Sequence, residues 1–98
     1  MYPAFAEVWA RNLPSISERV GTIERAAMAA EDGELDGELA ARAHSAAHKL
    51  SGSLGSFGLA HGSKLARELE RRFEAGQGNV DVAGLADLAA ALRAEIQR

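Results

Sequence analysis

The fold is decided by residues 37–57, which read GELAARAHSAAHKLSGSLGSF. Alanine and leucine, both strong helix formers, dominate this stretch. Its apolar side chains recur at the 3.6-residue period, and at about 100° per residue His48 falls on the opposite side. We therefore predict an amphipathic helix with one face in a core and His48 exposed on the other. The predicted core face consists of Leu39, Ala43, Ala46, Ala47, Leu50, Leu54 and Phe57.

Two glycines, Gly52 and Gly55, lie in the interior of this helix on the same side as His48. Each costs about 1 kcal/mol of helix stability relative to alanine. Neither glycine faces the predicted core, so tight core packing does not explain them. Together with the small side chain of Ser51 they leave a bare surface, across which another protein could approach His48 closely.

Outward from this helix, the chain is divided by breaks at Pro14, residues 31–37, Gly58 and residues 76–81. The linkers are short, so consecutive helices should be antiparallel neighbours. We predict a single all-α domain over residues 1–98, an up-down antiparallel four-helix bundle with an additional short N-terminal helix. The short helix is expected over residues 3–12, and the bundle helices over about 14–31, 37–57, 59–75 and 82–97. Pro14 should open the first bundle helix, with Asp36 and Asp81 as N-caps of the second and fourth.

The composition narrows the class of protein. The chain has 98 residues, 47% hydrophobic and 26% charged, with a net charge of −3 and no cysteine. The absence of cysteine excludes thiolate metal sites, disulfides and thiol nucleophiles. The negative net charge gives no sign of the basic surface that nucleic-acid binding usually needs. No apolar run reaches the length of a membrane span, and the first residues do not resemble a signal peptide. We expect a cytoplasmic monomer that binds neither nucleic acid nor membrane.

An imidazole in its neutral form is a good nucleophile, because one ring nitrogen carries a free lone pair. Attack on phosphorus requires position, access and the right tautomer. A carboxylate that holds the proton of the other ring nitrogen would fix that tautomer. Glu70 is the best-placed candidate, since it lies at the edge of the apolar stripe of the third helix, which should pack antiparallel against the second. That stripe consists of Leu65, Leu69 and Phe73.

The run AAHKLSGSLGSFGL, residues 46–59, resembles the signature of histidine-containing phosphotransfer (HPt) domains. In that family an apolar residue follows the histidine by two positions and glycines follow it by four and seven. A Phe-Gly or similar pair then ends the helix, and a Leu-Glu pair is common in the next helix. The resemblance covers roughly residues 15–97. The matching residues are His48, Leu50, Gly52, Gly55, Phe57-Gly58 and Leu69-Glu70.

The resemblance implies a four-helix bundle with the active histidine exposed on its second long helix. It implies that His48 accepts a phosphoryl group from a receiver-domain aspartyl phosphate, or from a kinase, and passes it to another receiver aspartate. The expected partner is the receiver domain of a response regulator or of a hybrid histidine kinase. Mg²⁺ would be held by the receiver, and this domain would bind no cofactor. The chain would be a phosphorelay carrier and not a turnover enzyme, with Glu70 as hydrogen-bond partner of the ring.

One position departs from the family pattern. Most members carry a lysine three residues after the histidine, where it can neutralise phosphate charge, and this chain has Ser51 there. Lys49 is adjacent in sequence but points about 100° away around the helix. Lys64 and Arg67 in the next helix could supply the charge instead. His44, one turn before His48, is expected to line the docking face.

The sequence leaves three alternatives open. The chain could be a non-catalytic helical interaction module of HPt fold that binds a receiver or kinase without transfer, which the departure at Ser51 supports. His44 and His48 form an H-x-x-x-H pair that could hold a metal ion, in principle with His61, although our prediction is that no metal is bound. The domain could also be an excised part of a larger hybrid kinase or regulator, which would leave its chemistry unchanged.

Overall fold

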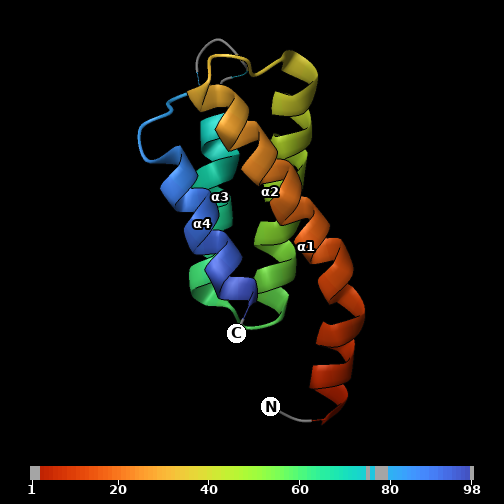
Figure 1. Ribbon diagram of the computed structural model, residues 1–98. Coiled ribbons are helices and arrows are strands. Elements are labelled where there is room, and N and C mark those ends of the chain that lie inside the picture. Colours follow the sequence, from red (N-terminus) through yellow and green to blue (C-terminus); the bar gives the residue numbers. More distant parts are fainter. Residues whose placement is uncertain (1–2, 75, 77–79, 98) are drawn as a thin grey trace.

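The computed structural model describes residues 3–74, 76 and 80–97, and for residues 3 and 4 the backbone alone. The described chain is all-α, as predicted, with no strand, and its four helices run up and down in sequence order (Figure 1). Helices that follow one another in the chain pack side by side, and α4 also packs against α1. The helices are α1 (Pro3–Glu31), α2 (Gly37–Ser56), α3 (Ala60–Glu74) and α4 (Leu85–Ile96).

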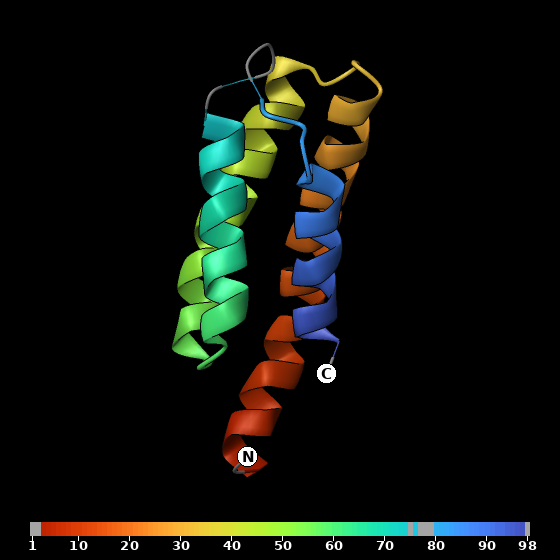
Figure 2. The ribbon, with the colours of Figure 1, turned by 90° about the vertical axis from the view of Figure 1, so that its left-hand side faces the viewer.

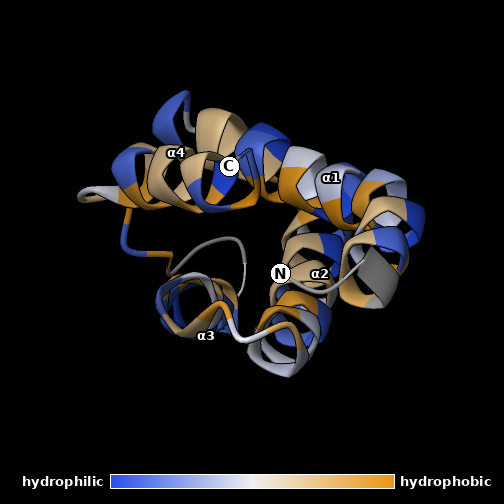
Figure 3. Cartoon of the chain, turned by 90° about the horizontal axis from the view of Figure 1, so that it is seen from below, coloured by the Kyte–Doolittle hydropathy of each residue, from blue (hydrophilic) through white to orange (hydrophobic). Residues whose placement is uncertain are grey.

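The core of the bundle forms where the apolar stripes of the four helices meet. Seen along the bundle, the hydrophobic faces of α1 and α4 turn toward α2 and α3 (Figure 3). The predicted core residues of α2 are buried, except that Leu39 and Phe57 at its two ends are half-buried. Burial of such side chains is the main source of stability in a small domain. The largest fully buried side chains are Ile16, Val20, Ile23, Leu50, Leu54, Leu69, Phe73, Leu85 and Leu92.

Helix α2 ends in a Schellman motif, which fixes the direction in which the chain turns into α3. Gly58 has φ of +78°, a left-handed conformation that glycine adopts without a Cβ penalty. Its N–H donates to the carbonyl of Gly55 at 3.0 Å, and the N–H of Leu59 donates to that of Leu54 at 2.8 Å. At the other end Asp36 is the N-cap, as predicted, and accepts a hydrogen bond from the Leu39 N–H at 2.7 Å.

The separate short helix predicted for residues 3–12 is not found, because α1 runs without interruption from Pro3 to Glu31 with Pro14 inside it. Proline lacks the N–H that would bond to the carbonyl four residues earlier, and its ring crowds that carbonyl. Helix α1 bends in its N-terminal half as a result, but it does not break (Figure 1).

Aromatic packing accounts for this continuity through Pro14. The rings of Phe5 and Trp9 meet the ring of Phe57 edge to face, with centroid distances of 5.4 and 5.0 Å. The N-terminal turns of α1, which extend beyond the α2–α3 end of the bundle (Figure 2), are thereby attached to the end of α2. These aromatic contacts stabilise the turns before Pro14 against its local preference for a helix break.

The prediction that Asp81 caps the last helix is also wrong. Helix α4 begins at Leu85, and its N-cap position is Gly84, with φ of +72° and no side-chain cap. The Asp81 carboxylate instead accepts a hydrogen bond from the Ala83 N–H at 3.0 Å within the loop. Arg72 of α3 donates to the backbone carbonyls of Asp81 and Ala83 at 3.0 and 2.8 Å, which holds the loop away from a helical path.

Helix α4 is clamped to α1 by Arg93. Its guanidinium donates to the Ser17 hydroxyl at 2.8 Å and to both carboxylate oxygens of Glu24, at 3.2 and 2.5 Å. The hydrogen bond to Glu24 raises the pKa of Arg93 above its ordinary value. None of the described helices is both long enough and apolar enough to cross a membrane.

Candidate functional site

The centre of the site is a pair formed by His48 of α2 and Glu70 of α3. The side chain of His48 is 71% exposed on the face of α2 opposite the core, as the helical period predicts. Its Nδ1 lies 3.0 Å from Oε2 of Glu70, whose side chain is 24% exposed. An ionised carboxylate can only accept, so Nδ1 carries the hydrogen and donates it. The lone pair of the neutral ring then resides on Nε2.

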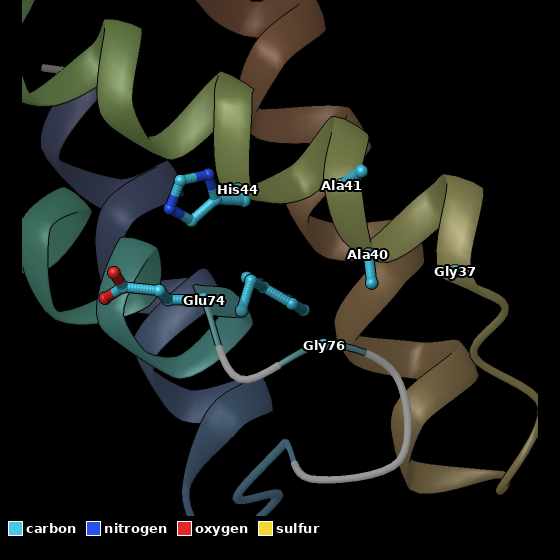
Figure 4. A pocket seen from close by; sticks show the side chains of 7 residues that line it. Gly37, Ala40, Ala41, His44, Glu74 and Gly76 are labelled. Atoms are coloured by element: carbon cyan, nitrogen blue, oxygen red, sulfur yellow. The ribbon is translucent and has the colours of Figure 1, made fainter.

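His44 lies one turn before His48 and also approaches Glu70, but less closely. Its Nε2 is 4.0 Å from the same carboxylate oxygen, which is beyond hydrogen-bond distance. Its side chain is 37% exposed at the edge of a shallow opening between the start of α2 and the end of α3 (Figure 4). His44 therefore borders the site and does not share its central hydrogen bond. The opening is lined by Gly37, Ala40, Ala41, His44, Phe73, Glu74 and Gly76.

His61 does not join the two histidines of α2. It lies in the first turn of α3 and contacts the buried carboxylate of Glu95 in α4 through Nδ1. Within the described ranges no group of three or more histidine, aspartate or glutamate side chains is arranged to hold a metal ion. The metal-site hypothesis that combined His44, His48 and His61 is therefore not supported by the geometry.

The glycines beside His48 are not required by packing within the chain. A Cβ added at Gly52 would meet nothing within 4 Å, and one at Gly55 would meet the Ser63 hydroxyl at 3.5 Å, an ordinary contact. Glycine in a helix interior nevertheless costs about 1 kcal/mol relative to alanine. The fold offers no compensation for this cost at Gly52, so the bare surface beside His48 is best explained by what must approach it.

Two small residues of α3 position the site and were missed in the sequence. A Cβ at Gly62 would lie 3.1 Å from Cδ1 of Leu54, so glycine at this position allows α3 to pack closely on α2. The Ser63 hydroxyl donates to the backbone carbonyl of Ser51 at 2.7 Å, one turn beyond His48. A Gly-Ser pair early in a helix with a strong apolar stripe is the signal that could have indicated this close packing.

Ser51 stands three residues after His48, where the resemblance led us to expect a lysine, and its hydroxyl is engaged within its own helix. It donates to the carbonyl of His48 at 2.7 Å, a bond that satisfies the hydroxyl without any contact to the imidazole ring. The side chain is short and half-buried. Ser51 therefore supplies no positive charge near Nε2.

The positive charge near the site comes from α3. Lys64 and Arg67 are exposed, and both line an opening that also includes Glu70 and Arg71. They also line a second opening, toward the end of α2, with Gly55, Gly58, Ala60 and Ser63. Lys49 is exposed but lines neither opening. Across the part of the chain that the structure describes, these three cations have no ion pair, whereas Arg71 and Arg72 both contact Glu68.

Unlike Lys64 and Arg67, the neighbouring Arg71 and Arg72 are both paired with a carboxylate, that of Glu68. Hydrogen bonds from Arg72 and then Arg71 lower the pKa of the Glu68 carboxyl below its ordinary value. Glu68 is thus held ionised, and its carboxylate offsets the charge of Arg71 and Arg72, although Arg71 also lines the opening beside Glu70. The structure therefore gathers most of the predicted surroundings around the central pair, and leaves Lys49 outside. The gathered residues are His44, Ser51, Gly52, Gly55, Lys64 and Arg67.

Fold and site together define a class of protein: an all-α bundle that exposes a carboxylate-paired imidazole on the middle of its second helix. The family model of the Hpt domain matches residues 7–98, and the chain belongs to this family. Hpt domains are carriers in the histidine phosphotransfer of two-component signalling, where they interact with receiver domains and kinases. No curated protein and no solved structure gives a significant match to the chain.

Proposed function

We propose that this chain is a phosphorelay intermediate in which Nε2 of His48 accepts a phosphoryl group from a receiver-domain aspartyl phosphate and returns it to another receiver aspartate. The observation that carries the proposal is the 3.0 Å contact between Nδ1 of the exposed His48 and Oε2 of Glu70. It assigns the hydrogen to Nδ1 and the lone pair to Nε2, the nitrogen that does not contact Glu70.

The chemical step needs little from this domain beyond that arrangement. The Nε2 lone pair attacks the phosphorus, an N–P bond forms, and the bond from phosphorus to the aspartate oxygen breaks, so that aspartate leaves as a carboxylate. The ring acquires positive charge as the bond forms, and the Glu70 carboxylate at Nδ1 stabilises that charge without leaving its place. Return of the group to a second aspartate follows the same path in reverse.

Docking of a receiver is supported by the shape and charge around His48. A Cβ placed on Gly52 would meet no atom within 4 Å, so the surface beside the imidazole is open to the rim of an acidic receiver pocket. Lys64 and Arg67 supply positive charge next to it, which favours association with an acidic partner. In this proposal the receiver brings the Mg²⁺ and this chain binds no cofactor.

The test is phosphoryl uptake from a phosphorylated receiver with Mg²⁺, followed as acid-labile, base-stable label on the chain. We expect label on the wild type and on the matched variants His44→Gln and His61→Gln, and none on His48→Gln. Label that persists in His48→Gln would contradict the assignment of the acceptor. A wild-type chain that binds receivers but takes up label from none of a broad panel would favour the second candidate, a module that binds without transfer, to which the absence of a lysine at Ser51 points.

A further inference from the structure

We propose that Arg67, supplied by α3 across the helix pair, is the cation that neutralises the phosphoryl group on His48; this inference rests on the proposed function. The need for such a cation follows from the site itself. A phosphoryl group on Nε2 brings about two negative charges. Glu70, already at Nδ1 of the same ring, adds a third. The single positive charge that the ring acquires does not balance these three, so without a further cation their repulsion would oppose phosphorylation.

The register of the antiparallel α2–α3 pair places Arg67 at the level of the residue that would otherwise provide the charge. Glu70 Oε2 lies 3.0 Å from Nδ1 of His48, and the Ser63 hydroxyl lies 3.5 Å from the point where a Cβ at Gly55 would be. Moving seven residues forward along α2, from His48 to Gly55, therefore corresponds to moving seven residues back along α3, from Glu70 to Ser63. By the same correspondence, three residues forward from His48 is Ser51 and three residues back from Glu70 is Arg67.

Arg67 also lies on the face of α3 that carries Glu70, as this role requires. It is three residues before Glu70, and residues at this spacing are neighbours on one face of a helix. Both line the same opening beside the α2–α3 pair. Three residues of helix amount to about 4.5 Å along the axis, which an arginine side chain spans easily. Its planar guanidinium can donate two parallel hydrogen bonds to phosphate oxygens.

The other candidate cations fit less well. Arg71 also lines the opening with Glu70, but its guanidinium is paired with Glu68, which offsets its charge. Lys64 lines both openings, as Arg67 does, but it is one turn farther from Glu70 along α3. Lys49 lies outside both openings. Arg67 is the one arginine of α3 without an ion pair in the described part of the chain, and it lies next to Glu70.

The first test uses phosphoramidate, a small donor that lacks a docking surface, so that effects on receiver binding do not contribute. Nε2 attacks its phosphorus, the P–N bond of the donor breaks, and ammonia leaves after protonation by solvent. Wild type should gain one phosphoryl group by mass spectrometry, and His48→Gln none. Arg67→Gln should react about tenfold more slowly, which corresponds to about 1.4 kcal/mol in the barrier.

Rescue gives the sharpest form of this test. Ser51→Lys in the Arg67→Gln background should restore the rate to within about twofold of wild type, since it returns a cation to the same level of the helix pair. Arg42→Gln removes an equal charge from the exposed side of α2, two turns before His48, and should leave the rate unchanged. A wild-type rate in Arg67→Gln, or an equal loss in Arg42→Gln, would overturn the proposal.

A second measurement separates this proposal from the proposed function. Titration with inorganic phosphate, followed by NMR, should shift the Arg67 side-chain resonances and the amides of Ser51 and Gly52, and Arg67→Gln should abolish the shifts. An absence of these shifts in the wild type would overturn the role of Arg67 even if His48 is phosphorylated. If the shifts appear but no donor labels His48, the anion site stands and the transfer function fails.

Discussion

The carboxylate of Glu70 meets the ring of His48 through Nδ1, at 3.0 Å, and leaves Nε2 as the ring nitrogen that does not contact Glu70. The two residues come from adjacent antiparallel helices and are 22 positions apart in the sequence. Their relationship joins the core packing of α2 and α3 to the chemistry at the surface, because any shift in helix register would separate them.

Replacement of Glu70 should change the tautomer and reactivity of the His48 ring and leave the fold intact. Glu70→Ala removes the acceptor at Nδ1, so we expect phosphoryl uptake by His48 to fall about tenfold or more, given that hydrogen bonds to charged groups contribute about 1.5–3 kcal/mol. Glu70→Gln keeps an acceptor oxygen and should retain more activity. The ¹⁵N NMR shifts of the His48 ring should show a loss of the Nδ1–H tautomer in Glu70→Ala. Unchanged uptake and tautomer in that variant would remove Glu70 from the site.

Two glycine-to-alanine substitutions should have opposite effects on stability. Gly52→Ala adds a methyl group in open space, so the free energy of unfolding should rise by up to about 1 kcal/mol. Gly62→Ala forces a methyl group to 3.1 Å from Cδ1 of the fully buried Leu54, and should lower that free energy by about 1 kcal/mol overall. Urea denaturation measures both.

The Gly52→Ala variant also separates stability from function. Gly52→Ala should slow transfer from a phosphorylated receiver while leaving the reaction with phosphoramidate unchanged, because the small donor needs no docking surface. If receiver transfer in Gly52→Ala proceeds at the wild-type rate, the clearance explanation for this glycine is wrong.

The N-terminal turns of α1 should depend on Phe57. Phe57→Ala removes the ring that both Phe5 and Trp9 contact edge to face, with a loss of about 1–3 kcal/mol from two aromatic pairs. We expect the helix to fray up to Pro14, with faster amide exchange at residues 5–13 and a red shift of Trp9 fluorescence. Val8→Ala, at an exposed position of the same turns, should leave both unchanged. Equal exchange in wild type and Phe57→Ala would show that α1 holds these turns without tertiary help.

Glu68 should give the bundle a small acid-dependent component of stability. Hydrogen bonds from Arg72 and Arg71 lower its pKa in the folded state, so the ionised form is favoured by folding. This stability is present above the pKa of the unfolded chain and is lost as pH falls through the lower folded-state pKa. Wild type should therefore unfold at a higher temperature than Glu68→Gln at neutral pH, and the difference should vanish in strong acid. A difference that persists at about pH 2 would contradict this assignment.

The sequence by itself determined the helical class, the bundle and the face on which His48 lies. These follow from local rules: the 3.6-residue period sets which side chains of α2 are buried, and Asp36 and Gly58 mark its ends. Glu70 could be predicted as the partner of His48 because short linkers make α2 and α3 antiparallel, so that the edge of one apolar stripe must meet the edge of the other.

Tertiary structure decided what depends on contacts between distant residues. Pro14 predicts a break by local preference, yet packing of Phe5 and Trp9 on Phe57 keeps α1 continuous. The carboxylate of Asp81 suits a cap, yet Arg72 draws the backbone around it into a loop.

The exact register of α2 against α3 was likewise beyond the sequence, because it depends on how closely Gly62 lets α3 approach Leu54. That approach, together with the hydrogen bond from Ser63 to Ser51, brings Arg67 to the level of Ser51. Local periodicity fixes the direction in which a side chain points around its own helix, whereas only packing fixes which residue of the next helix it meets.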